Sequence, residues 1–105
     1  MKIIKLKDSQ IVAYSFLKKE TIHISDLIEI NFHYQAVVGY DYVWELRDNN
    51  GKEIHFSKGT IGKMKFLKVL EKTIEGFSIQ DFKVKFEQGD VEESMTLWRK
   101  KGQHI

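Results

Sequence analysis

Apolar and polar residues alternate on both sides of a sharp turn signal in YVWELRDNNGKEIHF, residues 42–56. Asparagine followed by glycine is typical of a tight connection between antiparallel strands. A two-residue loop would place Leu46 opposite His55 and would mix apolar and charged side chains on each face. A three-residue loop over residues 49–51 brings like residues together instead. Its predicted pairs are Trp44 with Phe56, Leu46 with Ile54, Glu45 with His55 and Arg47 with Glu53.

This register predicts a hairpin with one apolar face and one polar, solvent-exposed face. A slip by one residue would turn every side chain to the wrong side, so the pattern strongly favours a single alignment. Each charged pair is expected to contribute only about 0.2 to 1 kcal/mol. We therefore interpret His55 as a surface residue beside a carboxylate and not as a catalytic base.

Three earlier segments also alternate and predict strands. KIIKLK, residues 2–7, is expected to be an edge strand, because its lysines discourage pairing with other chains. IVAYSF is expected to place Val12, Tyr14 and Phe16 on one face, with the KKE that follows as a turn. In TIHISDLIEINFHYQ, Ser25 and Asp26 interrupt the apolar positions and predict a bend or bulge. About six strands are expected before residue 58.

The period changes after Thr60, where apolar residues recur at helical spacing. The pattern predicts an amphipathic helix over about residues 60–75, with Thr60 capping its start and Gly76 following its end. The expected apolar positions are Met64, at the margin, Phe66, Leu67, Val69, Leu70, Ile74 and Phe77. The opposite face carries Lys65, Lys68 and Lys72.

The last thirty residues combine helix and strand signals. DFKVKF alternates like a strand, but Ser78 and Asp81 resemble a capping box, and Gly89 would end a helix. Phe77 and Phe82 occupy the two positions of a hydrophobic staple, so a short second helix is favoured over a strand. SMTLWRK then predicts a terminal strand, with Met95 and Leu97 on one face and Trp98 on the other.

Together these elements predict an α+β domain over residues 1–105, with a strongly bent antiparallel sheet of six to seven strands closed by a helix. Over about residues 10–77 the chain resembles bacterial pleckstrin-homology-like domains, through ETIHISDLIEI, YVWELRDNNGKEIHF and KMKFLKVLEKTI. The resemblance implies a partial barrel used for binding or assembly. Two features differ: almost thirty residues follow the helix, and only Lys18 and Lys19 stand where lipid-binding relatives carry a basic cluster.

Composition narrows the functional classes. The chain has 105 residues, no cysteine and a net charge of +2, which is too small to indicate nucleic acid by itself. Its N-terminus lacks the apolar core of a signal peptide, and no stretch approaches the eighteen or so apolar residues needed to cross a bilayer. We expect a soluble protein that is at most peripheral to a membrane, and the absence of cysteine suits the cytoplasm.

No motif indicates an enzyme, a metal site or a cofactor. The histidines His23, His33, His55 and His104 include no pair at helix spacing, and GTIGK lacks the spacing of a phosphate-binding loop. His23 and His33 could approach each other on the polar face of neighbouring strands, but unmatched histidines rarely form a site without a second shell, so none is expected.

Three functional hypotheses follow. The leading one is a non-enzymatic module for protein contact or self-association through Tyr40, Tyr42 or Trp98. The alternative is a small ligand-binding domain or enzyme with a pocket near His23, His33 and Glu29. A third hypothesis, less favoured than either, is contact with anionic lipid or nucleic acid through Lys65, Lys68 and Lys72.

Overall fold

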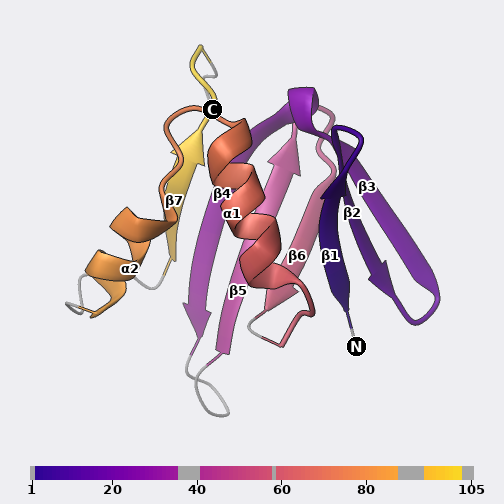
Figure 1. Cartoon of the computed structure of the whole chain (residues 1–105), viewed down its shortest axis with the longest axis horizontal. Coiled ribbons are helices and arrows are strands. Elements are labelled where there is room, and N and C mark those ends of the chain that lie inside the picture. Colours follow the sequence, from indigo (N-terminus) through magenta and orange to yellow (C-terminus); the bar gives the residue numbers. More distant parts are fainter. Residues whose placement is uncertain (1, 36–40, 58, 88–93, 103–105) are drawn as a thin grey trace.

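The computed structural model describes residues 2–35, 41–57, 59–87 and 94–102 (Figure 1). Antiparallel strands and two helices make up this part of the chain, which confirms an α+β protein. The elements are β1 (Ile3–Lys7), β2 (Gln10–Ser15), β3 (Lys18–His23), η1 (Ile24–Asp26), β4 (Leu27–Gln35), β5 (Asp41–Asp48), β6 (Glu53–Ser57), α1 (Lys63–Thr73), α2 (Ile79–Glu87) and β7 (Ser94–Arg99).

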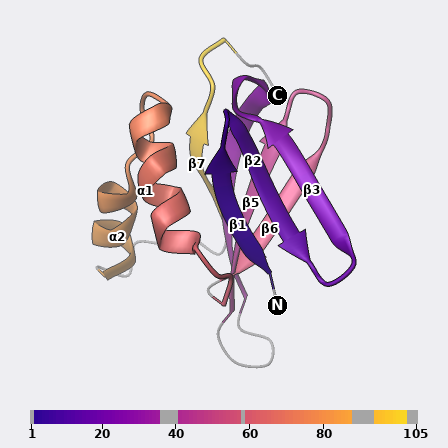
Figure 2. The same cartoon turned by 45° about the vertical axis from the view of Figure 1, so that its right-hand side comes forward.

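The strands form two sheets where the sequence predicted one bent sheet. One sheet has the order β1-β2-β3 and the other β6-β5-β4-β7. They lie side by side, with α1 in front of the four-stranded sheet and in contact with β1 (Figures 1 and 2). The connection is the short 3-10 helix η1, at the expected interruption around Ser25 and Asp26. The chain therefore turns a corner at this point and enters a new sheet.

The β5–β6 hairpin has the predicted register, with Trp44 opposite Phe56 and Glu45 opposite His55. Gly51 has a φ of 83°, in the left-handed region that a three-residue loop requires. Asp48 fixes the turn, because its Oδ1 accepts hydrogen bonds from the backbone N–H groups of Asn50 and Lys52 at 2.9 and 2.8 Å.

The expectation for IVAYSF was correct only in part: Val12 and Tyr14 share one face of β2, and Val12 is 6% exposed, but Phe16 lies beyond the strand. Ile11 and Ala13 face the core with exposed fractions of 0% and 1%, whereas Tyr14 lies on the opposite face. The chain also turns back earlier along the sequence than expected, because Phe16 and Leu17 form the turn and Lys18 already begins β3. Alternation continued into the turn and gave no signal of where the strand ends.

Helix α1 confirms the predicted amphipathic helix but begins later than expected. Thr60 does not cap it: its hydroxyl oxygen accepts a hydrogen bond from the Ser57 N–H at 3.1 Å. Gly62 precedes the helix with a φ of 82°, and a Cβ there would lie 2.8 Å from the Ile4 carbonyl oxygen. Gly62 therefore lets the helix start close against β1.

The favoured second helix is confirmed as α2. Ser78 caps it, since its hydroxyl accepts a hydrogen bond from the Asp81 N–H at 3.2 Å. Glu71 of α1 also accepts a hydrogen bond from the Ile79 N–H at 2.6 Å and so ties the two helices together. Gly89, the expected stop, lies outside the described residues.

The terminal strand is confirmed, but its facing was predicted wrongly. β7 pairs with β4, with Ile30 opposite Trp98 and Phe32 opposite Met95. The register shifts between these pairs, so the strand contains a bulge that turns Met95 and Trp98 to the same face. A regular period of two cannot anticipate this insertion.

Both sheets and both helices contribute to one apolar core. Among the described residues, eleven large side chains have exposed fractions below 2%, including Phe32 of β4 and Phe66 and Leu70 of α1. Within the described part of the chain, no helix is long and apolar enough to span a membrane.

Candidate ligand pocket

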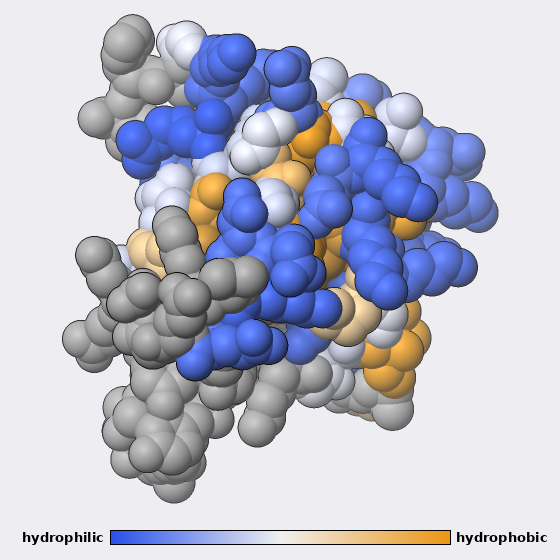
Figure 3. Space-filling model, turned by 60° about the vertical axis from the view of Figure 1, so that its left-hand side comes forward, coloured by the Kyte–Doolittle hydropathy of each residue, from blue (hydrophilic) through white to orange (hydrophobic). Residues whose placement is uncertain are grey.

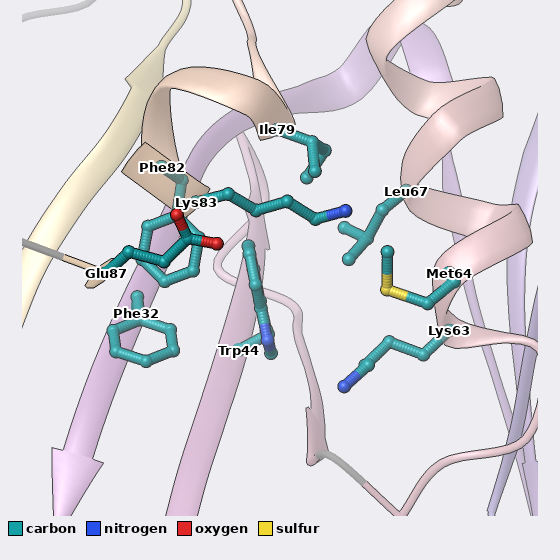
Figure 4. Close-up of a pocket in the computed structure, with 9 residues that line it drawn as sticks. All are labelled: Phe32, Trp44, Lys63, Met64, Leu67, Ile79, Phe82, Lys83 and Glu87. Carbon is teal, nitrogen blue, oxygen red and sulfur yellow. The ribbon is translucent and has the colours of Figure 1, made fainter. Parts of the chain in front are cut away.

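A pocket of about 320 Å³ lies where α1 and α2 meet the core-facing side of β4 and β5 (Figure 4). This volume falls at the lower end of the range typical of small-molecule sites. The lining residues are Phe32, Trp44, Lys63, Met64, Leu67, Ile79, Phe82, Lys83 and Glu87.

Aromatic rings form the inner wall of the pocket. Phe32 and Trp44 are neighbours across β4 and β5, with ring centroids 5.4 Å apart in an edge-to-face arrangement. Phe82 of α2 contacts both, at centroid distances of 4.7 Å to Phe32 and 5.1 Å to Trp44. Phe56 of β6 stacks on Trp44, with ring centroids 5.8 Å apart, and so supports the Trp44 side of the inner wall.

Aliphatic side chains form the rest of the wall. Leu67 is 1% exposed and Ile79 is 6% exposed, so both belong to the core as well as to the pocket. Met64 is 39% exposed and marks the rim on α1. Its flexible thioether suits a wall that must adapt to a ligand.

The charged groups of the pocket lie around its mouth. In Figure 4 the Lys83 side chain extends from α2 toward Leu67, with the Lys63 ammonium group on the α1 side and the Glu87 carboxylate beside Phe82. Among the described residues that line the pocket, the charged groups are therefore two ammonium groups and one carboxylate. On the face shown in Figure 3, apolar surface appears in narrow areas between polar side chains.

The opposite side of the same sheet carries a polar network instead. Glu29 and Asn31 of β4 are only 4% and 8% exposed. The Arg99 guanidinium donates two hydrogen bonds to Glu29 Oε2, at 3.1 and 3.0 Å, and Asn31 Nδ2 donates to Glu29 Oε1 at 2.6 Å. Thr96 donates to Asn31 Oδ1 at 2.8 Å. Side chains of β7, the neighbouring strand, thus bind the polar side chains of β4.

Glu45 lies in the middle of this network and is 8% exposed. Burial acts to raise the pKa of its carboxyl, whereas hydrogen bonds from Asn31 and His55 lower it. With the charges of Arg47 and His33 added, the pKa falls below its ordinary value of 4.5. Glu45 is therefore ionised at neutral pH.

The residues of the expected histidine pocket divide between two places. His33 and Glu29 belong to the polar network, through Glu45 and Asn31. His23 is exposed at the end of β3, and its Nδ1 shares a 2.7 Å hydrogen bond with Ser25 Oγ. None of the three lines the apolar pocket.

The expected partner contacts are placed only in part. Tyr40 and the side chain of Tyr42 lie outside the described residues. Trp98 is half-buried, and its Nε1 donates a 2.8 Å hydrogen bond to the Glu75 carbonyl oxygen, so it fastens the end of α1 to β7. Lys65 and the other lysines of the predicted anionic-contact face, Lys68 and Lys72, are exposed on α1.

The turn between β2 and β3 is an apolar surface that the sequence did not predict. Phe16 and Leu17 are 91% and 87% exposed, the highest values among the large apolar residues described. Lys18 and Lys19 follow them directly. Two adjacent large apolar side chains in water favour contact with another surface.

Comparisons with protein-family models, with curated proteins and with solved structures found no match. Sequence reasoning missed the apolar pocket because its walls come from four elements, and their side chains follow the same pattern as core residues. The staple pair Phe77 and Phe82 was the nearest signal, since it placed Phe82 on the inner side of a helix.

Proposed function

We propose that the protein is a non-enzymatic binding module whose pocket takes a small amphipathic molecule, with an aromatic or short aliphatic body and one acidic group. The observation that carries the proposal is the apolar cavity of about 320 Å³ with aromatic walls and lysines at its mouth. An apolar body would bury its surface against Trp44 and Phe82, and an acidic group at the mouth would lie near Lys83.

Binding is preferred to catalysis because the inner wall is apolar and the charged groups lie at the rim. Two antiparallel sheets joined at a corner, followed by α1, support a pleckstrin-homology-like partial barrel as the scaffold of this module. The helix α2 and strand β7 extend beyond that pattern. Location in the cytoplasm stays a prediction from the sequence.

The test uses anilinonaphthalene sulfonate, which combines an aromatic body with an acidic group. We expect its fluorescence to rise on binding and hexanoate to displace it. Met64→Trp should fill the mouth of the pocket and abolish binding, because Met64 lines the pocket and is 39% exposed. Val69→Trp is the matched control, since Val69 lies on the same helix, is 37% exposed and does not line the pocket.

Lys83→Glu should weaken binding of the anionic probe, while Lys68→Glu, on the exposed face of α1, should leave it unchanged. Equal binding by the Met64→Trp and Val69→Trp proteins, with both folded by circular dichroism, would contradict the proposal. So would equal binding of hexanoate and hexanol, because the lysines at the mouth would then contribute nothing.

The exposed turn supports a second candidate function, attachment to an anionic membrane surface. Phe16 and Leu17 would enter the interface, and Lys18 and Lys19 would lie near the negatively charged headgroups. Each basic residue near such a surface contributes about 1 kcal/mol. Vesicles of phosphatidylcholine with phosphatidylglycerol should retain the protein in sedimentation, and a Phe16→Ser and Leu17→Ser double variant should stay in solution. Equal sedimentation of both would contradict it.

A further inference from the structure

Three potential metal ligands converge on the polar side of the four-stranded sheet. Their ligand atoms come from Glu45 of β5 and from Glu53 and His55 of β6, and all three lie within 4.8 Å of one another. His55 Nε2 is 3.3 Å from Glu45 Oε2 and 3.3 Å from Glu53 Oε1. The hairpin register creates this arrangement, because Glu45 stands opposite His55.

These separations match those around a tetrahedral ion. Zinc binds imidazole nitrogen and carboxylate oxygen at about 2.0 to 2.2 Å, so two ligands of one tetrahedral ion lie roughly 3.4 Å apart. The pairs that His55 makes with Glu45 and Glu53 differ from this spacing by about a tenth of an ångström. The third separation, between the ligand oxygens of Glu45 and Glu53, lies within 4.8 Å.

The remaining carboxylate oxygens are already engaged, which orients both carboxylates. Arg47 Nη2 lies 3.1 Å from Glu45 Oε1 and 3.2 Å from Glu53 Oε2, the oxygens that do not face His55. Asn31 Nδ2 also donates to Glu45 Oε1, at 3.0 Å. Hydrogen bonds of this kind behind the ligands fix their orientation and raise metal affinity.

His33 contacts the same site from β4. Its Nε2 lies 3.5 Å from Glu45 Oε2, and its Nδ1 shares a 2.9 Å hydrogen bond with Ser94 Oγ. When Nδ1 donates this hydrogen bond, Nε2 carries the lone pair that a metal ion requires. His33 therefore lies next to Glu45, beside the group formed by Glu45, Glu53 and His55.

The charge balance of the network favours an added cation. Its ion pairs join three carboxylates, those of Glu29, Glu45 and Glu53, with two guanidinium groups, those of Arg47 and Arg99. Without its histidines, this set of described residues carries one net negative charge. A metal ion bound at His55 would reverse that imbalance without displacing Arg47 from its own oxygens.

We propose that Glu45, Glu53 and His55 bind a divalent transition metal of the zinc, nickel or copper class, with His33 next to the site. Imidazole nitrogen combined with carboxylate oxygen suits these ions better than magnesium or calcium, which prefer oxygen ligands alone. The site is independent of the apolar pocket, because alternate side chains of β5 face opposite sides of the sheet.

The test is calorimetric titration of the untagged, chelator-treated full chain with zinc chloride and, separately, with magnesium chloride. We expect one zinc ion per chain and no magnesium binding. His55→Ala should weaken zinc binding at least ten-fold, and Glu53→Gln should weaken it as well. His23→Ala is the matched control, because His23 is exposed and makes its own hydrogen bond to Ser25 away from the site.

Chemical shifts of the histidine rings provide a readout that does not depend on stability. Zinc should shift the His55 and His33 ring signals and leave those of His23 unchanged. Absence of zinc binding by the folded protein would overturn the proposal and leave an ion-pair network only. Equal zinc affinities of the His55→Ala and His23→Ala proteins would also overturn it, as would shifts confined to His23.

Discussion

Both faces of the four-stranded sheet contain buried side chains, but these are buried by different means. On one face, α1 and α2 cover apolar side chains such as Trp44, which is 5% exposed. On the other face no helix is present in the described part of the chain, yet the neighbouring Glu45 is 8% exposed. The side chains of Arg47 and Arg99 lie across the carboxylates and take the place of a covering element.

The difference shows what each face can contribute. Burial of apolar surface stabilises the face covered by helices. The pocket lies on this face because α1 and α2 do not fill all the space over β4 and β5. Hydrogen bonds fix the buried side chains of Glu29, Asn31 and Glu45 on the other face, so it contributes geometry more than free energy. We therefore expect the free energy of unfolding to depend mainly on the face covered by helices. Each face has its own proposed binding site, the apolar pocket on one and the metal-binding cluster on the other.

Trp44→Ala should have the largest effect on stability. Trp44 packs against Phe32, Phe56 and Phe82, and truncation of a buried tryptophan costs about 3 to 5 kcal/mol of the free energy of unfolding. Urea unfolding followed by circular dichroism measures this loss. A change below about 1 kcal/mol would show that the aromatic wall does not stabilise the fold.

Glu29→Gln tests the polar face at its most buried carboxylate. The amide would leave one of the donors from Asn31 and Arg99 without an acceptor, so we expect a loss of about 2 kcal/mol. Glu53→Gln is the control, because the Glu53 side chain is 37% exposed, and its loss should stay below about 0.5 kcal/mol. Equal losses in the free energy of unfolding would show that burial of a carboxylate on this face does not affect stability.

Acidification should weaken the polar face selectively. The pKa of Glu45 is lower in the folded state than its ordinary value of 4.5, so its contribution is present above that pH and is lost as the pH falls through the lower folded value. In metal-free buffer, Glu45→Gln should therefore unfold with a weaker dependence on pH below about 4.5 than the parent protein. Parallel pH profiles would contradict this assignment.

His55→Ala should have the smallest effect on stability without metal. The His55 side chain is 50% exposed, and exposed ion pairs contribute about 0.2 to 1 kcal/mol. Thermal unfolding in the presence of a chelator should therefore be nearly unchanged. A large destabilisation would show that His55 has a structural role that its exposure does not suggest.

The sequence predicted the local features best. Matching of Trp44 with Phe56 and of Glu45 with His55 was enough to define the β5–β6 hairpin, because both signals lie within a few residues of the turn. The second helix followed from its cap at Ser78 in the same way. These features depend on neighbours in the chain.

Features that depend on distant segments escaped prediction. Burial of Glu29 requires Arg99, seventy residues away, and alternation shows only that Glu29 faces away from the apolar side. The bulge in β7 is an insertion that breaks the period, and it turned Trp98 to a different face from the expected one. Both the pocket and the metal-binding cluster arise only when separate strands and helices come together.

Proton–nitrogen correlation NMR of the two tryptophan indole groups, during titration with anilinonaphthalene sulfonate, tests the pocket most directly. Trp44 lines the pocket, whereas the Trp98 indole is bound to the Glu75 carbonyl outside its walls. We predict that the Trp44 indole signal shifts in a saturable manner and that the Trp98 signal stays in place. A shift of Trp98 alone, or no saturable shift of Trp44, would contradict a ligand site on the helical face of the sheet.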